Sequence, residues 1–151
     1  MESRYKSYHS IEKLPELVGE TVTINGWVHN ITGKGKLQFI QMRDGSGFVQ
    51  CVVFKGNVSE EVFEQCKQLT QEASVSITGT VRAEERSATG VEVDVQSVRI
   101  WQIPTEQYPI TPKEHGIEFL MEHRHLWLRS TRQHAIMRIR AAVAKAIRDF
   151  F

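Results

Sequence analysis

Apolar and polar residues alternate along most of residues 20–100, which is the pattern of strands that bury one face. Turn-forming residues divide this region into short runs. The sequence Asp44-Gly45-Ser46-Gly47 predicts a tight hairpin, because glycine readily takes the positive φ that such turns require. The expected strands cover residues 20–30, 37–43, 48–54, 75–81 and 91–100. This succession of short strands predicts a fold that is mainly β.

The hydrophobic period changes once within this region. Apolar residues fall at helical spacing across residues 59–69, and Ser59 is a typical helix cap. The element order predicts a five-stranded OB-fold barrel with a helix between strands 3 and 4, a small Greek-key barrel of a kind that binds oligonucleotides. Other five-stranded barrels give a similar order of strands, but the helix between the third and fourth strands favours the OB-fold.

The strand pattern ends near residue 102. Three prolines, Pro104, Pro109 and Pro112, interrupt regular structure, so residues 103–130 are predicted to form a proline-containing hinge. The barrel with its N-terminal residues is therefore expected to form one domain, residues 1–102.

A C-terminal α-helix is predicted over residues 131–151, with an apolar face. The apolar face consists of Ile136, Ile139, Val143, Ile147 and Phe150. No later residues are available to pack on this face. The helix therefore either folds back on the barrel or begins a further domain of a longer protein, in which case the face contacts that domain or a second subunit.

Composition and charge change this picture little. The 151 residues are 40% hydrophobic and 25% charged, with four prolines, which is enough apolar material for a compact core. The formal net charge is +1, so no overall electrostatic field points to nucleic acid. The charge is uneven, however. Residues 113–151 carry eight basic and four acidic side chains, a balance of +4, which leaves −3 for residues 1–112.

Two cysteines, Cys51 and Cys66, are too few for a disulfide scaffold and are typical of a reducing compartment. The start of the chain lacks the apolar stretch of a signal peptide, and no run reaches the length of a membrane span. We therefore expect a cytoplasmic protein with no membrane partner.

The sequence contains no motif typical of a catalytic centre, so no catalytic residue is predicted. His123 and His125 are only two residues apart, but no cysteine lies near them. Solvated or hydrogen-bonded histidines explain this pair better than a metal site, so no metal ligand is predicted.

Candidate binding residues lie on the expected strands. Phe39 offers an aromatic face on which an unpaired base could stack, and Gln50 and Glu92 offer groups that could bond to base edges. Three cations could contact the RNA backbone: Lys34, Lys36 and Arg43. Chemistry alone leaves another interpretation open, in which Phe39 belongs to the core and Gln50 and Glu92 are ordinary solvent-facing residues.

Several strings resemble class II aminoacyl-tRNA synthetases. Gly26-Trp27-Val28 followed by residues 39–50 is similar to the anticodon-binding domain of the aspartyl, asparaginyl and lysyl enzymes. The hinge strings at residues 108–116, 118–121 and 123–130 resemble asparaginyl-tRNA synthetases of a bacterial type. The resemblance extends from about residue 10 to residue 151.

The resemblance implies roles for single residues. Phe39 matches the aromatic residue on which the family stacks the central uridine of the anticodon, GUU in tRNA(Asn). Gln50 matches the glutamine that reads this uridine, and Glu92 matches an acidic residue that helps to recognise anticodon bases. One departure concerns the arginines that usually precede the aromatic residue, where this chain has Asn30, Ile31 and Thr32. Weaker affinity for the anticodon is therefore expected.

The resemblance also implies the setting of the domain. The C-terminal helix is similar to the opening of motif 1, which forms the homodimer interface in this family. Motifs 2 and 3, which bind ATP and the adenylate, are not present in the chain. We therefore expect no cofactor in this segment and no catalysis by it alone, whereas the parent enzyme would ligate asparagine to tRNA(Asn) with ATP and Mg²⁺.

Three alternatives remain. The nearest is the corresponding domain of an aspartyl-tRNA synthetase. The second is a freestanding OB-fold protein that binds single-stranded nucleic acid. The third is a regulatory or structural paralogue that uses the apolar helix to dimerise or to dock on another protein.

Overall fold

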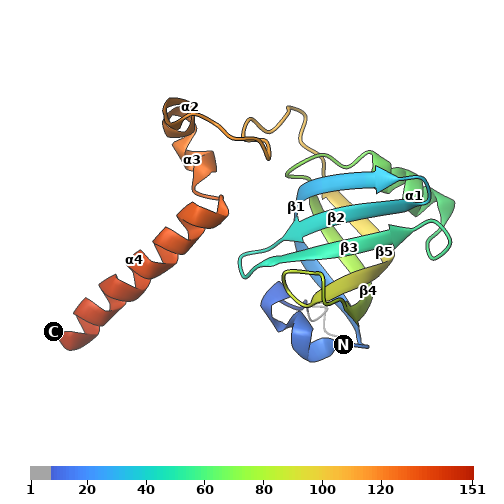
Figure 1. The fold of residues 1–151 in the computed structure, drawn as a ribbon, viewed down its shortest axis with the longest axis horizontal. Coiled ribbons are helices and arrows are strands. Elements are labelled where there is room, and N and C mark those ends of the chain that lie inside the picture. The colour runs from blue at the N-terminus through green and yellow to red at the C-terminus, as the bar shows by residue number, and fades with distance from the viewer. Residues whose placement is uncertain (1–7) are drawn as a thin grey trace, which may run out of the picture. The chain divides into compact units, whose positions relative to one another are not determined.

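A computed structural model describes residues 8–151 of the chain. The chain divides into two compact units, with the boundary between Tyr108 and Pro109. The first unit contains the predicted barrel, and the second contains the C-terminal helix (Figure 1). The boundary lies within the predicted hinge.

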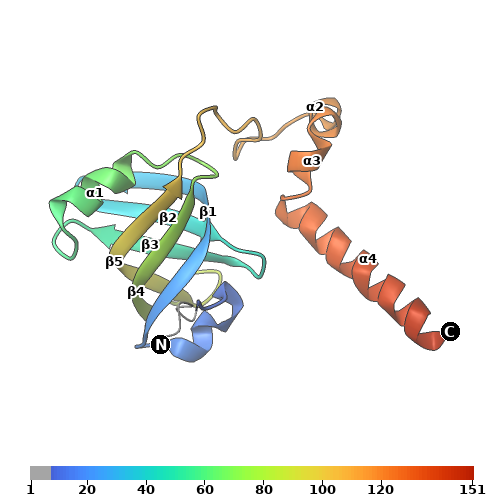
Figure 2. The same ribbon diagram turned by 180° about the vertical axis from the view of Figure 1, so that it is seen from behind.

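Within the described part of the first unit, five strands close into a barrel. They are β1 (Thr21–Lys34), β2 (Leu37–Arg43), β3 (Phe48–Phe54), β4 (Ser74–Ala83) and β5 (Val91–Gln102). Their order around the barrel is β1-β2-β3-β5-β4, and only the β3–β5 pair is parallel. Figure 2 shows the β1, β4 and β5 side of this barrel. Together with α1 (Glu60–Lys67) between β3 and β4, the topology confirms the predicted OB-fold.

Two glycines allow neighbouring strands to approach closely. A Cβ at Gly26 on β1 would collide with the backbone carbonyl of Arg43 on β2, and one at Gly79 on β4 would collide with that of Asp94 on β5. Gly79 also lies at an irregularity in the β4–β5 pairing. Both positions therefore require a residue without a side chain, because the colliding atoms belong to the backbone.

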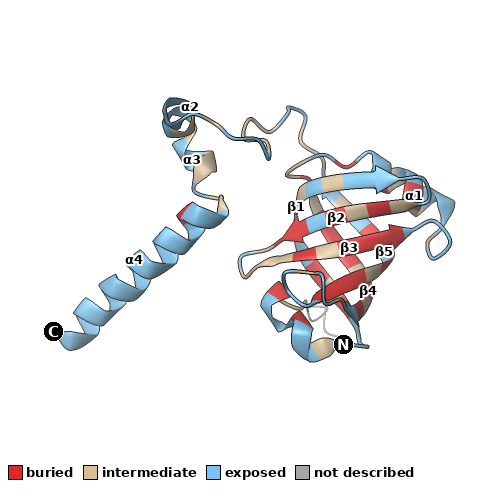
Figure 3. Cartoon of the chain, in the orientation of Figure 1, coloured by how far each residue is buried: buried red, intermediate tan, exposed pale blue. Residues whose placement is uncertain are grey.

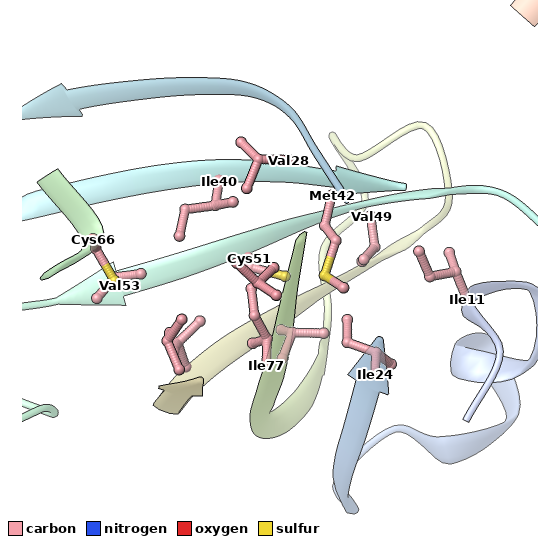
Figure 4. Close-up of a cluster of buried hydrophobic side chains, with 14 of the residues drawn as sticks. Ile11, Ile24, Val28, Ile40, Met42, Val49, Cys51, Val53, Cys66 and Ile77 are labelled. Atoms are coloured by element: carbon pink, nitrogen blue, oxygen red, sulfur yellow. The ribbon is translucent and has the colours of Figure 1, made fainter. Parts of the chain in front are cut away.

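The core fills the inside of the barrel with side chains from every strand. Figure 3 shows buried stretches on the strands in red. Its members include Ile24, Val28, Ile40, Met42 and Ile77, all fully buried and drawn in Figure 4. Cys51 and Cys66 also lie in this cluster. Burial raises the pKa of both thiols, to about 11 for Cys66, so these residues serve as packing groups rather than as nucleophiles.

A short 3₁₀ helix, η1 (Ile11–Leu17), precedes the barrel and was not predicted from the sequence. Its Ile11 and Leu14 are buried in the core. The Asp44 carboxylate in the β2–β3 turn holds this helix, because it accepts a hydrogen bond from the Ile11 amide at 2.9 Å. The same carboxylate accepts bonds from Ser46 and from the Gly47 amide. The hairpin turn therefore also anchors the N-terminal segment.

Asp44 should make the barrel sensitive to acid. Burial acts to raise the pKa of Asp44, but the hydrogen bonds from Ser46, Ile11 and Gly47 outweigh it and lower the pKa below its ordinary value of 3.8. A lowered pKa stabilises the fold above the ordinary value, and this stability is lost as the pH falls through the folded-state pKa. We expect Asp44→Ala to reduce the free energy of unfolding by about 1 kcal/mol at pH 7, because the hydrogen bonds to the carboxylate are lost. The loss is modest because the site is partly exposed.

Urea titrations of the wild type and of Asp44→Ala measure this contribution. The gap between the two proteins should narrow as the pH falls below 3.8, the ordinary pKa of this group. Glu16→Ala serves as the control, since Glu16 is an exposed carboxylate on η1. An equal loss of stability in both variants at pH 7 would contradict a specific role for the Asp44 bonds.

The second unit contains three helices within residues 109–151. They are α2 (Ile117–Glu122), α3 (Arg124–Trp127) and α4 (Thr131–Phe150). The predicted hinge therefore includes two short helices, α2 and α3. Ser130 caps α4 by accepting a hydrogen bond from the Gln133 amide. No helix among the described residues is both long and apolar enough to cross a membrane.

The apolar face of α4 has the composition predicted for it. Ile136, Ile139, Val143, Ile147 and Phe150 are all exposed in the chain. Figure 3 shows α4 almost entirely in the colour of exposed residues. This face is therefore an apolar surface of the second unit, of a kind that usually marks an interaction site.

Candidate nucleic-acid interface

A groove of about 820 Å³ lies on the outer face of the barrel. Its floor is formed by β2, β3 and β5, and its wall includes the end of β4 and, from the loop that follows, residues 84 and 86–89. The strand period explains the groove, because alternate side chains point outward while their neighbours fill the core. On β2, for example, Phe39 and Gln41 line the groove whereas Ile40 and Met42 are buried in the core.

Four polar side chains form one continuous row across the groove. Gln41 on β2 pairs in register with Gln50 on β3, Gln50 with Glu92 on β5, and Glu92 with Arg82 on β4. This polar row therefore crosses four neighbouring strands on one face. The pairing brings together Gln50 and Glu92, which are 42 residues apart in the sequence.

Hydrogen bonds connect three members of the polar row. Gln50 Nε2 donates to Glu92 Oε1 at 2.7 Å, and Arg82 donates to Glu92 Oε2 at 3.0 Å. Arg82 also lies 3.6 Å from the Asp94 carboxylate. Glu92 is only 7% exposed, so its carboxylate is held inside the sheet surface by partners on both sides. The interpretation of Glu92 as an ordinary solvent-facing residue is therefore wrong.

Aromatic side chains give the groove its apolar part. Phe39 is half-buried and lines the groove, and it does not belong to the buried core of the described residues. Phe48 and Phe54 on β3 line the groove as well. Leu37, two residues before Phe39 on β2, also lines the groove. The alternative that places Phe39 in the core is therefore wrong.

The three predicted cations occupy different environments. Lys34 and Lys36 are exposed at the turn between β1 and β2. Lys34 pairs in register with Leu37, which lines the groove, so this turn lies beside one end of it. Both lysines are therefore available to solvent near the groove.

Arg43 differs, because its guanidinium already has an internal partner. It is 8% exposed and lies outside the groove, and its NH2 group contacts both Glu72 oxygens, at 2.6 and 2.8 Å. The Trp27 ring lies 5.6 Å from the guanidinium carbon. The expectation that Arg43 supplies charge to an RNA backbone therefore needs correction. Its ion pair with Glu72 joins β2 to the loop before β4.

Sequence reasoning missed Arg82, Arg86 and the other residues of the wall. Arg86 bonds to Glu84, and both line the groove together with Ser87 and Thr89. The signal for Arg82 was its position just beyond Val81, the last apolar residue of the predicted fourth strand. Its register with Glu92 depends on the β4–β5 pairing, which has two irregularities and cannot be derived from spacing alone.

The arrangement has the features of a site for single-stranded nucleic acid. It combines aromatic faces, a hydrogen-bonding row and flanking cations on an open sheet surface. A family model described as an OB-fold nucleic acid binding domain, the tRNA anticodon family, matches residues 22–101, which are 80 of the 151 residues. The chain belongs to this tRNA anticodon family. The groove lies within the matched residues.

Relatives of known name extend this likeness beyond the barrel. Asparagine–tRNA ligase of Herpetosiphon aurantiacus is 60% identical over 133 residues, which cover 88% of this chain and 30% of the relative. Asparagine–tRNA ligase of Deinococcus deserti is 57% identical over 142 residues, covering 94% of this chain and 32% of the relative. The chain thus spans about a third of the length of the curated relatives it matches.

A solved structure with a similar fold is asparaginyl-tRNA synthetase from Pyrococcus horikoshii. Its TM-score is 0.85 at 37% identity, and the match covers 95% of this chain and 35% of that one. Together with the match to the tRNA anticodon family, these relatives confirm the resemblance to class II aminoacyl-tRNA synthetases that the sequence strings indicated.

Proposed function

We propose that this chain reads the GUU anticodon of tRNA(Asn) as the anticodon-binding part of an asparagine–tRNA ligase. The observation that carries the proposal is the groove itself, which presents Phe39 beside the hydrogen-bonded pair of Gln50 and Glu92. The 60% identity to a ligase of that name supports asparagine rather than another amino acid.

The groove suits an unpaired anticodon for physical reasons. The central uracil stacks on the half-buried ring of Phe39, which contributes about 1–3 kcal/mol. Phe39 and Val52 are register partners, and Gln50 lies two residues before Val52 on the same face. The amide of Gln50 therefore meets the polar edge of a base stacked on Phe39. The lysines at the β1–β2 turn supply positive charge for the phosphates.

The remaining functions belong to the proposed parent enzyme. Asparagine activation would use ATP and Mg²⁺ in the catalytic domain, and the apolar face of α4 would contact that domain and a second subunit of a homodimer. Residues 8–151 bring together no group of three His, Cys, Asp or Glu side chains suited to a metal ion, so no step is assigned to Mg²⁺ here. The cytoplasm, where tRNA charging occurs, is the proposed location.

Binding of an anticodon stem-loop tests the proposal. At low salt, the chain should bind a loop with GUU about tenfold more tightly than the same loop with GCU, because one base contact is lost. Equal binding to both loops would contradict anticodon reading and would make the domain a general single-strand binder. Absence of binding would contradict the proposal that this groove carries recognition without the catalytic domain.

An aspartyl-tRNA synthetase is the second candidate for the parent. Aspartyl-tRNA synthetase from Entamoeba histolytica has a TM-score of 0.82 at 26% identity, and the match covers 95% of this chain and 37% of that one. The anticodon GUC of tRNA(Asp) differs from GUU only in its third base. A stem-loop with GUC that binds as tightly as the GUU loop would favour this candidate.

A further inference from the structure

We infer that Glu92 and Arg82 are positioning residues that fix the direction in which the Gln50 amide reads a base. This inference rests on the proposed function, because it concerns the same groove. An isolated glutamine amide donates at one end and accepts at the other, and it can turn over. A glutamine that turns freely can match either uracil or cytosine, whereas a fixed one cannot.

The hydrogen bonds of the polar row remove this freedom. Arg82 is permanently charged and pairs with Glu92 at 3.0 Å, so the carboxylate between Arg82 and Gln50 is an acceptor only. The group that Gln50 turns toward Glu92 must therefore be its NH2, and the Nε2–Oε1 distance is 2.7 Å. Glu92 is held in place, because its side chain is 9% exposed and both of its oxygens have partners, Oε1 with Gln50 and Oε2 with Arg82.

Strand order then sets where the Gln50 oxygen points. β3 lies between β2 and β5 in the barrel, and Glu92 is on β5. Because the amide is planar, its oxygen lies on the side away from its nitrogen and so toward β2, where Gln41 is the register partner of Gln50 and Phe39 is the next outward residue. A base stacked on Phe39 thus meets an acceptor and must bring a donor. Uracil offers this donor at N3. Cytosine has a lone pair at N3 and a donor only at its 4-amino group, so an amide oxygen aligned with N3 accepts a hydrogen bond from uracil alone.

The substitution Glu92→Gln tests the inference. A neutral glutamine can accept from Gln50 or donate to it, so the Gln50 amide regains both orientations. The ratio of GUU to GCU stem-loop affinity should fall about tenfold, with the GCU loop binding more tightly than it does to the wild type. A merely structural role for Glu92 would weaken both loops alike and leave the ratio unchanged, which would overturn the inference.

Two further variants make this result specific. Glu85→Gln removes the same charge from an exposed residue that does not line the groove, so it should leave the ratio unchanged. Arg82→Gln disturbs the same network from a side chain that is 49% exposed and tolerant of change, so it should lower the ratio. An equal effect of Glu85→Gln and Glu92→Gln would show that net charge alone is responsible.

NMR of the free protein separates this inference from the proposed function. One side-chain N–H of Gln50 should be shifted and protected from exchange by its bond to Glu92, and both effects should weaken in Glu92→Gln, where the amide has two orientations. An unprotected Gln50 amide in the wild type would overturn the inference whatever the RNA results. A protected amide together with equal binding of the two loops would instead overturn the proposed function.

Discussion

Replacement of Phe39 by alanine should weaken binding of the GUU stem-loop by about 1–3 kcal/mol, which is roughly 5- to 150-fold in Kd. The ring is half-buried on the outer face of β2, so its removal takes away the surface on which a base stacks. The barrel should stay folded, because the core lies on the other face of the strand, around Ile40 and Met42.

Fluorescence anisotropy with a labelled stem-loop measures the loss, and circular dichroism monitors the fold. Tyr8→Ala is the control, since Tyr8 is an aromatic residue that is 50% exposed and lies outside the groove. Tyr8→Ala should leave loop binding within twofold of the wild type. Unfolding of the Phe39→Ala barrel at room temperature would show that this ring supports the core after all.

Alanine at Gly26 should lower the free energy of unfolding by about 3 kcal/mol, at the upper end of the usual cost of overpacking. The new Cβ would collide with the Arg43 carbonyl, and a backbone atom held in a β1–β2 pair cannot rotate aside as a side chain does. Separation of the strands at this point would disturb the closed barrel. Gly79→Ala should cost a similar amount, because its Cβ would meet the carbonyl of Asp94.

Denaturant titration of the two variants against Gly45→Ala measures this cost. A Cβ at Gly45 would meet no atom within 4 Å, so Gly45→Ala should change stability by less than about 1 kcal/mol. If Gly26→Ala were as stable as Gly45→Ala, β1 and β2 would have to separate without loss of stability. This result would contradict the requirement for glycine at position 26.

The sequence predicted the strands well because turn-forming residues bound each run of strand-forming residues. It could not decide which face turned inward on every strand, because a run such as LQFIQMR on β2 has no clear period of two. Leu37 and Phe39 point to one side of the strand and Ile40 to the other, but all three are apolar, so the local pattern does not show which side faces the core. Closure of the barrel places Leu37 and Phe39 outside, with Ile40 inside. Burial of a given face depends on neighbours from other strands, which local periodicity does not contain.

The missed contacts share a second cause, which is distance along the chain. Arg43 was expected to contact RNA because its pairing with Glu72 could not be foreseen. Glu72 lies 29 residues away, in a loop with no recognisable pattern. Arg82 was overlooked because its importance comes from the β4–β5 register with Glu92. The residues that matched family motifs, Phe39 and Gln50, were located correctly in the groove, although their contacts with RNA remain a prediction.

The 3₁₀ helix η1 was missed for a further reason. It is only seven residues long, and Pro15 lies inside it and interrupts a regular helical pattern, although its leucine, glutamate and lysine residues favour helix. Only Ile11 and Leu14 indicate burial, and their site exists only when the barrel is present. The helix is therefore stabilised by packing rather than by its own sequence.

The place of η1 has a consequence for synthesis on the ribosome. Ile11 and Leu14 emerge early, but the barrel closes only after β5 ends at Gln102, which is 85 residues after Leu17 (102 − 17). At about 5–20 residues per second this interval lasts about 4–17 s, and exposed apolar residues favour misassociation during it. The turn at Asp44 offers η1 an earlier binding site. It belongs to the β2–β3 hairpin, whose contacts are local, so the nascent segment gains a docking site before the last strand leaves the exit tunnel.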